Sequence, residues 1–143
     1  MKLRDATPQD AEALGAILTE FVATTDWMPE LHTPEEDRGF CLAMIERGWV
    51  RLVEGPEIMG FIARDAAEVN ALYVGARHRG QGAGTALLKE AQATRDDLTL
   101  WTFQDNLGAR RFYATHGFVE TQRTDGSRND EGLPDVQLEW RRP

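Results

Sequence analysis

Three glycines stand at alternate positions in the stretch RGQGAG, which runs from Arg79 to Gly84. The strand-like run VNALYV comes shortly before this stretch, and the helix-like run TALLKEAQ follows it. A helix N-terminus carries free N–H groups and the positive end of a dipole, and glycines let such amides approach phosphate oxygens closely. Arg77 and His78 add basic groups at the entrance. These residues predict a phosphate-binding loop, and the alternative is a solvated loop with ordinary surface arginines.

The loop departs from the two best-known phosphate-binding patterns. A P-loop requires a lysine before its Ser or Thr, and Gly84-Thr85 lacks that lysine. A dinucleotide-binding fingerprint places Gly or Ala where Thr85 stands, three residues after Gly82. Asp105 follows about 20 residues further on, as that fingerprint favours, but too little chain remains to build a doubly wound sheet. A nucleotide-phosphate site of another kind stays open on these residues alone.

Three motifs in a fixed order resemble the GNAT superfamily of acyl-CoA N-acyltransferases. Arg79 to Gly84 matches the family's Q/R-x-x-G-x-G/A motif, and Leu72-Tyr73-Val74 precedes it. NLGARRFYATHGF, from Asn106 to Phe118, is similar to the family's N-x-x-A-x-x-F-Y-x-x-x-G-F segment. The resemblance covers nearly the whole chain. It implies the GNAT fold and transfer of an acetyl group from acetyl-CoA to a primary amine, of a small molecule or a peptide, by direct attack in a ternary complex. The alternative is a non-catalytic module that binds acyl-CoA as a sensor or partner.

The resemblance also implies where acetyl-CoA binds. The backbone amides from Gln81 to Thr85 would hold the pyrophosphate, and Arg79 would add charge. The strand ending in Leu72-Tyr73-Val74 would splay from the run LTLWTF, and its freed backbone groups would pair with the pantetheine arm. The residues expected to bind acetyl-CoA are Leu72, Tyr73, Val74, Arg79, Gly80, Gln81, Gly82, Ala83, Gly84, Thr85, Asn106, Arg110 and Tyr113.

Acetylation of an amine needs a base, a site for the developing oxyanion and an acid for the departing thiolate. The resemblance gives the backbone N–H of Leu72 the oxyanion role and Tyr113 the acid role. Glu68 is the candidate base that the resemblance implies, because several family members carry a glutamate four residues before the Leu72 position. Period-2 alternation also puts Glu68 on one side of the strand with Asn70 and Leu72 unless a bulge intervenes. A solvated strand-end carboxylate is the alternative for Glu68, and the base can also lie elsewhere or act through a water relay. The alternative for Tyr113 is a core residue beside Phe112.

In the family that the chain resembles, the loop between the first two helices and the final strand pair line the acceptor site; here these segments are TTDWMPELHT and TDGSRNDEGLPD. The first loop offers Trp27, Met28 and His32, of which the first two look exposed, and Asn70 is added from the central strand. The second loop offers Asp125, Asp130, Glu131 and Asp135. Aromatic and acidic groups suit a cationic amine through cation–π contacts and ion pairing. The alternative is that the acidic loops only keep the protein soluble.

Composition narrows the possible partners. The 143 residues fit one domain (1–143), and the hydrophobic share of 41% with 28% charged residues is typical of a globular protein. A net charge of −8, from 24 acidic and 16 basic side chains, argues against nucleic acid or an anionic membrane as partner. No apolar run approaches the ~20 residues of a membrane span, and the run MKLRDATPQDAEALG lacks the apolar stretch that is expected of a secretory signal. We therefore expect a cytoplasmic protein, with a homodimer among the assemblies that the sequence leaves open.

The histidines His32, His78 and His116 lack the spacing of metal ligands, so we expect no metal. The single cysteine, Cys41, is predicted to be a small core residue on the apolar face of a helix, together with Phe40, Met44 and Ile45.

The elements that must position these residues follow from hydrophobic periodicity and capping signals. Thr7-Pro8 and Thr33-Pro34 each predict a helix start, and Asn106 predicts the cap of a helix that runs to His116. LTLWTF is predicted to be a strand buried inside the sheet, with Trp101 packed there. The element order is β α α β β β α β α β β. It predicts an α/β protein with a mixed sheet of six to seven strands, flanked by about four helices.

Overall fold

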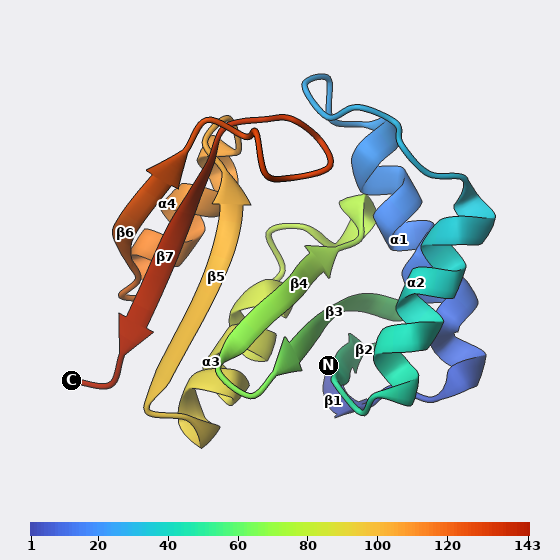
Figure 1. Cartoon of the computed structure of the whole chain (residues 1–143). Coiled ribbons are helices and arrows are strands. Elements are labelled where there is room, and N and C mark those ends of the chain that lie inside the picture. The colour runs from blue at the N-terminus through green and yellow to red at the C-terminus, as the bar shows by residue number, and fades with distance from the viewer.

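A computed structural model of the chain describes all residues, 1–143. Its centre is a seven-stranded mixed sheet in the order β1-β2-β3-β4-β5-β7-β6 (Figure 1). The strands are β1 (Lys2–Asp5), β2 (Val50–Glu54), β3 (Ile58–Asp65), β4 (Glu68–Val74), β5 (Asp97–Phe103), β6 (Val119–Thr124) and β7 (Asp135–Arg141). The helices are α1 (Ala11–Ala23), α2 (Pro34–Glu46), α3 (Ala83–Thr94) and α4 (Leu107–Thr115), with 3-10 turns η1 (Pro8–Asp10) and η2 (Ala76–His78). The predicted fold class and element order are confirmed.

Two hydrophobic clusters lie on opposite faces of the sheet. Helices α1 and α2 pack over β2, β3 and β4 through residues such as Leu14, Met44 and Phe61. Helices α3 and α4 cover the other face, where Leu87 and Tyr113 belong to one cluster with side chains of β5 and β7 (Figure 1). The central strand β3 is apolar at almost every position, because both of its faces are covered. None of the four helices combines the length and the hydrophobicity that a membrane span requires.

Strands β4 and β5 are parallel neighbours that separate along their length. Only Glu68 with Thr99 and Val69 with Leu100 are paired between them. In contrast, all seven residues of β5 pair with β7 on its other side. Beyond Val69, the edge of β4 that faces β5 therefore has no backbone partner in the sheet. Figure 1 shows the two ribbons diverging toward their C-terminal ends, so the expected splay is confirmed.

A bulge in β4 changes the face on which its residues lie. Val69 and Ala71 pair with neighbouring residues of β3, so Asn70 between them is the extra residue. As a result, Val69 and Leu72 pack beneath α3 and α4, whereas Ala71 packs beneath α1 and α2. The expectation that Glu68, Asn70 and Leu72 share one side of the strand is therefore wrong, since the extra residue shifts the period-2 alternation.

Side-chain caps explain two of the helix boundaries. The Thr33 hydroxyl accepts the N–H of Glu36 at 3.1 Å, while Glu36 accepts the N–H of Thr33 at 2.9 Å. The Asn106 side chain accepts the N–H of Ala109 at 3.1 Å at the start of α4. Such caps stabilise a helix by about 1 kcal/mol each. Helix α3 differs, because it begins after Gly82 with no side-chain cap.

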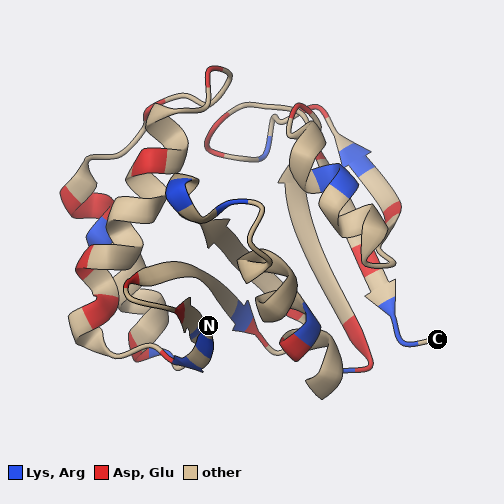
Figure 2. Cartoon of the chain, turned by 180° about the vertical axis from the view of Figure 1, so that it is seen from behind, with Lys and Arg blue, Asp and Glu red and all other residues tan.

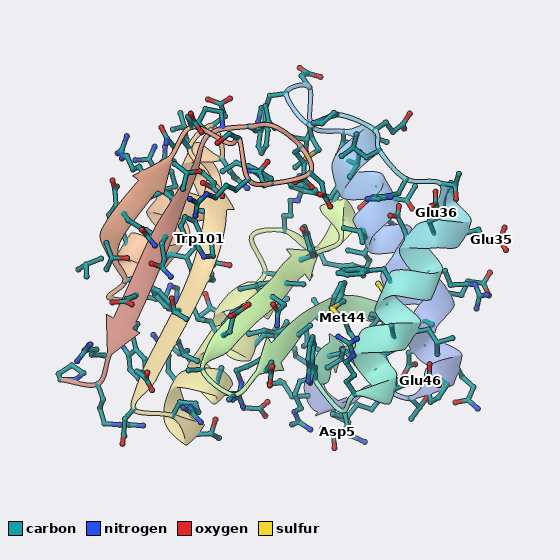
Figure 3. The ribbon with its side chains drawn as sticks, viewed as in Figure 1. Asp5, Glu35, Glu36, Met44, Glu46 and Trp101 are labelled. Carbon is teal, nitrogen blue, oxygen red and sulfur yellow. The ribbon has the colours of Figure 1, made fainter.

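Three aromatic residues lie differently from expectation. Phe40 is 54% exposed, because the buried stripe of α2 is centred on Cys41 and Met44 and leaves Phe40 on its flank. Trp101 on β5 is 42% exposed rather than packed inside the sheet. Leu98 and Leu100 turn toward α3 and α4, so Trp101 lies on the opposite face, where α1 and α2 cover only β2, β3 and β4 (Figure 3). Trp27 is half-buried, because its ring packs between those of Phe21 and Phe103.

Candidate active site

The glycine loop connects η2 to α3 and has a left-handed backbone at two positions. Gly80 and Gly82 have φ angles of +75° and +89°, which L side chains rarely adopt, and no atom lies within 4 Å of where a Cβ would stand. Glycine is thus required here by the backbone conformation, and the space beside it is open. The N–H of Ala86 is bonded to the carbonyl of Gly82 at 2.9 Å. The amides from Ala83 to Thr85 precede that first helical bond and lack such a partner, so they can bind an anion.

A pocket of about 100 Å³ lies where β4 and β5 separate. Its walls come from α1, the α1–α2 loop, β4, β5 and α4, and 11 of its 14 lining residues are hydrophobic, which suits an acyl chain better than a charged group. The pocket brings together six of the predicted site residues: Met28, Asn70, Leu72, Tyr73, Asn106 and Tyr113. The lining residues that sequence reasoning did not single out for the site are Phe21, Val69, Ala71, Leu100, Trp101, Thr102, Phe103 and Ala109.

The backbone of Leu72 faces the gap between the strands. Gly75 donates its N–H to the carbonyl of Met59 at 2.8 Å, and hydrogen-bonded pairs recur at every second residue of an antiparallel ladder. By this alternation Leu72 and Val74 direct their N–H and C=O groups away from β3. Because β5 does not pair with this part of β4, these groups have no partner in the sheet.

The Tyr113 hydroxyl opens into the pocket from α4. The residue is only 7% exposed, and its ring packs against those of Phe112 and Phe118. Its hydroxyl is bonded to no protein group. The only fully buried side-chain polar atom without a hydrogen-bond partner is Nε of Arg95. The unpartnered Tyr113 hydroxyl is therefore not fully buried, and the open space that it reaches is the pocket. Burial, and to a smaller extent the neighbouring Tyr73 hydroxyl, raises the pKa of Tyr113 above its usual range, so the hydroxyl is protonated at neutral pH. Tyr113 is thus both a core residue and a pocket residue.

Glu68 lies apart from these groups. It starts β4 opposite Thr99, at the end where β4 and β5 are still paired, and it is exposed and does not line the pocket. Since the neighbouring Val69 faces α3 and α4 together with Leu72, Glu68 lies on the opposite face of the strand. The structure therefore does not bring the Glu68 carboxylate together with Tyr113.

Aromatic rings lie on the side of the pocket nearest α1. Phe21, Tyr73 and Phe103 line the pocket, whereas Trp27 packs against Phe21 and Phe103 and does not line it itself. The ring centroids of Phe21 and Tyr73 are 5.1 Å apart, and that of Trp27 lies 5.8 Å from that of Phe103. These rings come from α1, the α1–α2 loop, β4 and β5, and they form a continuous wall that can contact an apolar chain or a cation. His32 is exposed in the same loop and does not line the pocket.

The loop between β6 and β7 brings negative charge to this side. Asn129 holds the loop closed, because its amide donates to the carbonyl of Leu133 at 2.8 Å and accepts the N–H of Leu133 at 3.2 Å. Figure 1 shows the loop extending from the β6–β7 edge toward the side of the molecule that carries α1. Burial raises the pKa of Tyr73 to about 12, and the nearby carboxylate of Glu131 adds to this effect. The β6–β7 loop thus adds negative charge to the electrostatic surroundings of Tyr73.

Arg110 is directed to another part of the fold. Its Nη1 donates to the carbonyl of Gln104 at 3.0 Å, and its Nη2 lies 3.8 Å from a carboxylate oxygen of Glu120. It does not line the pocket, although it shares a helix with Tyr113.

A larger, open cleft of about 680 Å³ lies elsewhere, between the end of α2, the β3–β4 turn and α3. Arg47, Arg51 and Arg64 are balanced in its walls by three carboxylates, so the cleft has no net charge. None of the predicted site residues lines it.

Comparison with known proteins agrees with the motifs. The acetyltransferase (GNAT) family matches residues 12–118 of the chain. Over 127 residues, the chain is 28% identical to the peptidyl-lysine N-acetyltransferase YjaB of Salmonella typhimurium, covering 87% of this chain and 88% of that protein. The solution structure of apo-form YjaB from Escherichia coli is similar to the fold with a TM-score of 0.81 at 21% identity, over 99% and 98% of the two chains. YncA from Salmonella typhimurium, a structure with its cofactor acetyl-CoA, has a TM-score of 0.74 at 19% identity, over 99% and 93%. The chain belongs to the GNAT family and is an N-acetyltransferase.

Proposed function

We propose that this N-acetyltransferase binds acetyl-CoA along the gap between β4 and β5 and transfers the acetyl group to a lysine side chain of a peptide. The observation that carries the proposal is that three features able to bind parts of acetyl-CoA lie in sequence along one path between η2 and the pocket. An uncapped helix N-terminus behind a glycine loop, an unpaired strand edge and a protonated tyrosine hydroxyl follow one another from η2 to the pocket. A related fold, that of YncA, is described with acetyl-CoA as its cofactor.

The residues on this path fit the parts of acetyl-CoA in order. The amides of Ala83 to Thr85 and the exposed Arg79 suit the pyrophosphate, and the left-handed glycines before them leave open space. The unpaired groups of Leu72 and Val74 suit the amides of the pantetheine arm, as an added strand would. The hydrophobic pocket suits the acetyl group. Asn106, which caps α4, lines the pocket beside it.

Two groups of the chain would act on the reacting atoms. The N–H of Leu72 would donate to the thioester carbonyl oxygen, on which negative charge develops as the amine attacks. The Tyr113 hydroxyl would give its proton to the sulfur as the C–S bond breaks and the C–N bond forms. The hydroxyl suits this role because it is protonated at neutral pH and has no other partner.

The acceptor must lose a proton before it attacks, and none of the pocket residues is a carboxylate or a histidine. We therefore assign proton removal to water in the gap, with the exposed Glu68 as the group that receives the proton beyond it. Glu68 acts in this scheme through water and not by direct contact, because it directly precedes the part of β4 that lines the pocket and does not line it itself.

A peptidyl lysine is the acceptor that the pocket surroundings favour. Phe21 and Phe103, with Trp27 packed against both, offer a wall for an alkyl chain, and the negative charge of Glu131 in the β6–β7 loop would attract an ammonium group. The relative YjaB of Salmonella typhimurium is described as a peptidyl-lysine N-acetyltransferase. Trp27, Met28 and Asn70 are the residues that we propose to contact this acceptor, and His32 lies at the outer end of the same loop.

The test is an acetylation assay with acetyl-CoA and a peptide whose only free amine is one lysine. Wild-type protein should acetylate the lysine, as detected by mass spectrometry, and a peptide with glutamine at that position should stay unmodified. Tyr113→Phe keeps the ring in its packing and removes only the hydroxyl, so turnover should fall by about 100-fold while CoA affinity holds.

The chain offers a matched control, because Tyr73 and Tyr113 are its two tyrosines and both line the pocket. Tyr73 packs on the face of β4 beneath α1 and α2, opposite Leu72, and so on the side proposed for the acceptor. Tyr73→Phe should therefore change the KM for the peptide more than kcat. Near-normal kcat in Tyr113→Phe would remove its hydroxyl from the mechanism. Failure of the wild type to acetylate any lysine peptide while it acetylates small amines would overturn the proposed acceptor.

A further inference from the structure

The turn η2, which leads from β4 into the glycine loop, is held to the rest of the fold by two glutamates. Ala76 donates its N–H to Oε1 of Glu20, near the end of α1, at 2.8 Å. Nε2 of His78 lies 2.8 Å from Oε1 of Glu57, in the turn between β2 and β3. Glu20 and Glu57 precede the loop by a long stretch of chain. The start and the end of η2 are therefore both fixed by tertiary contacts.

The His78 end of η2 is well packed. The His78 side chain is only 18% exposed. It lies close to the backbone of Gly75, because a Cβ placed on Gly75 would stand 3.5 Å from Cδ2 of His78. Gln81, inside the glycine loop, donates its amide to the carbonyl of Arg77 at 3.2 Å. A shift of η2 would therefore pass directly to the loop and to the first amides of α3.

The charge of Glu57 works against the binding of an anion at the loop. Its carboxylate lies 3.6 Å from Nη1 of Arg77 as well as beside His78, so it weakens the positive field of this basic segment. Figure 2 shows basic residues on the segment between β4 and α3, where the sequence has Arg77 and Arg79. If Glu57 affected a bound pyrophosphate by charge alone, its removal would tighten binding. A benefit to binding must come from the position that it imposes.

We propose that Glu57 and His78 form a positioning clamp that sets the glycine loop for the pyrophosphate of CoA, with Glu20 holding the other end of η2. The inference rests on the proposed binding of acetyl-CoA at this loop. The clamp residues are positioning residues, because they act through η2 and Gln81 on the backbone that binds the phosphates.

The test separates position from charge with two substitutions at Glu57. Glu57→Asp keeps the charge but shortens the side chain by one methylene, so the 2.8 Å contact with His78 is lost. Glu57→Ala removes both contact and charge. Calorimetric titration with CoA should show affinity about tenfold weaker for Glu57→Asp, the size expected for one lost charged hydrogen bond. The Glu57→Ala and His78→Ala variants should weaken CoA similarly, and the double variant should lose little more than either single one.

Two controls distinguish the clamp from general loss of structure. Glu54→Ala alters the same hairpin, but the partner of Glu54 is Arg4 on β1, so CoA affinity should stay at the wild-type value. Acetyl-pantetheine is a thioester without the pyrophosphate, and its kcat/KM should be unchanged in the clamp variants while the KM for acetyl-CoA rises. Equal loss for both thioesters would mean a structural defect and would overturn the inference.

Two further results of the CoA titrations would reject the clamp. CoA affinity unchanged in Glu57→Asp and tightened in Glu57→Ala would show that Glu57 acts by charge alone, and the clamp would be rejected while the proposed function stands. Absence of CoA binding by the wild-type protein would overturn the proposed function and the clamp with it.

Discussion

The first turns of α2 and α3 both have backbone N–H groups without a partner inside the helix, but side chains cap these groups only at α2. Helix α2 begins with the reciprocal hydrogen bonds of Thr33 and Glu36, and its first turn carries three acidic residues (Figure 3 labels Glu35 and Glu36). The backbone N–H of Thr33 lowers the pKa of Glu36, as expected for an anion held at a helix start. Helix α3 begins after Gly82 with no side-chain cap and no acidic residue in its first turn.

The difference shows that one helix start is completed by the chain itself and the other is left for a ligand. At α2, carboxylates of the same helix occupy the place where the dipole attracts negative charge. At α3, the pyrophosphate of CoA would take that place. A capped helix is stabilised before any ligand arrives, whereas the uncapped start of α3 gains its stabilisation only when an anion binds.

The largest expected effect comes from giving α3 an anion of its own. In Gly82→Asp, a carboxylate would stand where the phosphates bind, and two like charges about 4 Å apart near a protein surface repel by roughly 4 kcal/mol. CoA affinity, measured by calorimetry, should fall by about 100-fold or more.

The matched control for this variant is Gly82→Asn, because Asn and Asp have similar shapes and both tolerate a left-handed backbone better than other side chains. Its loss of affinity should be much smaller than that of Gly82→Asp. Equal losses in the two variants would mean that backbone strain and not charge is responsible, and the comparison between the helix starts would fail.

The smaller effect is expected at α2. Thr33→Ala removes the hydroxyl that accepts the N–H of Glu36, so the free energy of unfolding should decrease by about 1 kcal/mol in denaturant titrations. CoA affinity should stay at the wild-type value, because this helix start is already complete without a ligand. A clear loss of CoA affinity in Thr33→Ala would contradict the division of roles between the two helices.

The sequence alone was sufficient for the features that depend on local residue types. Thr33 and Asn106 predicted their helix starts, because each signal lies within a few residues of its effect. The left-handed backbone at Gly80 and Gly82 is likewise a local property of glycine. The splay of β4 from β5 came from the family resemblance and not from residue spacing. Neither strand carries a sequence signal that ends its pairing.

Features that depend on distant parts of the chain were not predictable in the same way. The bulge at Asn70 has no glycine or proline to mark it, and it moved Leu72 to the face opposite Glu68. The contribution of Phe21 to the pocket follows from the end of α1 meeting β4, which periodicity within α1 cannot show. Glu57 and Glu20 reach η2 only through the tertiary fold.

The central claim is that the free amides at the start of α3 bind the pyrophosphate of CoA. The direct measurement is a titration of nitrogen-15-labelled protein with CoA, followed by backbone amide NMR. The amides from Gly80 to Thr85 should show the largest shifts, those of Leu72 and Val74 should also shift, and those from Glu35 to Asp37 in α2 should stay in place. Acetyl-pantetheine should shift Leu72 and Val74 but leave the loop amides unchanged. CoA binding that leaves the amides from Gly80 to Thr85 unshifted would contradict the account.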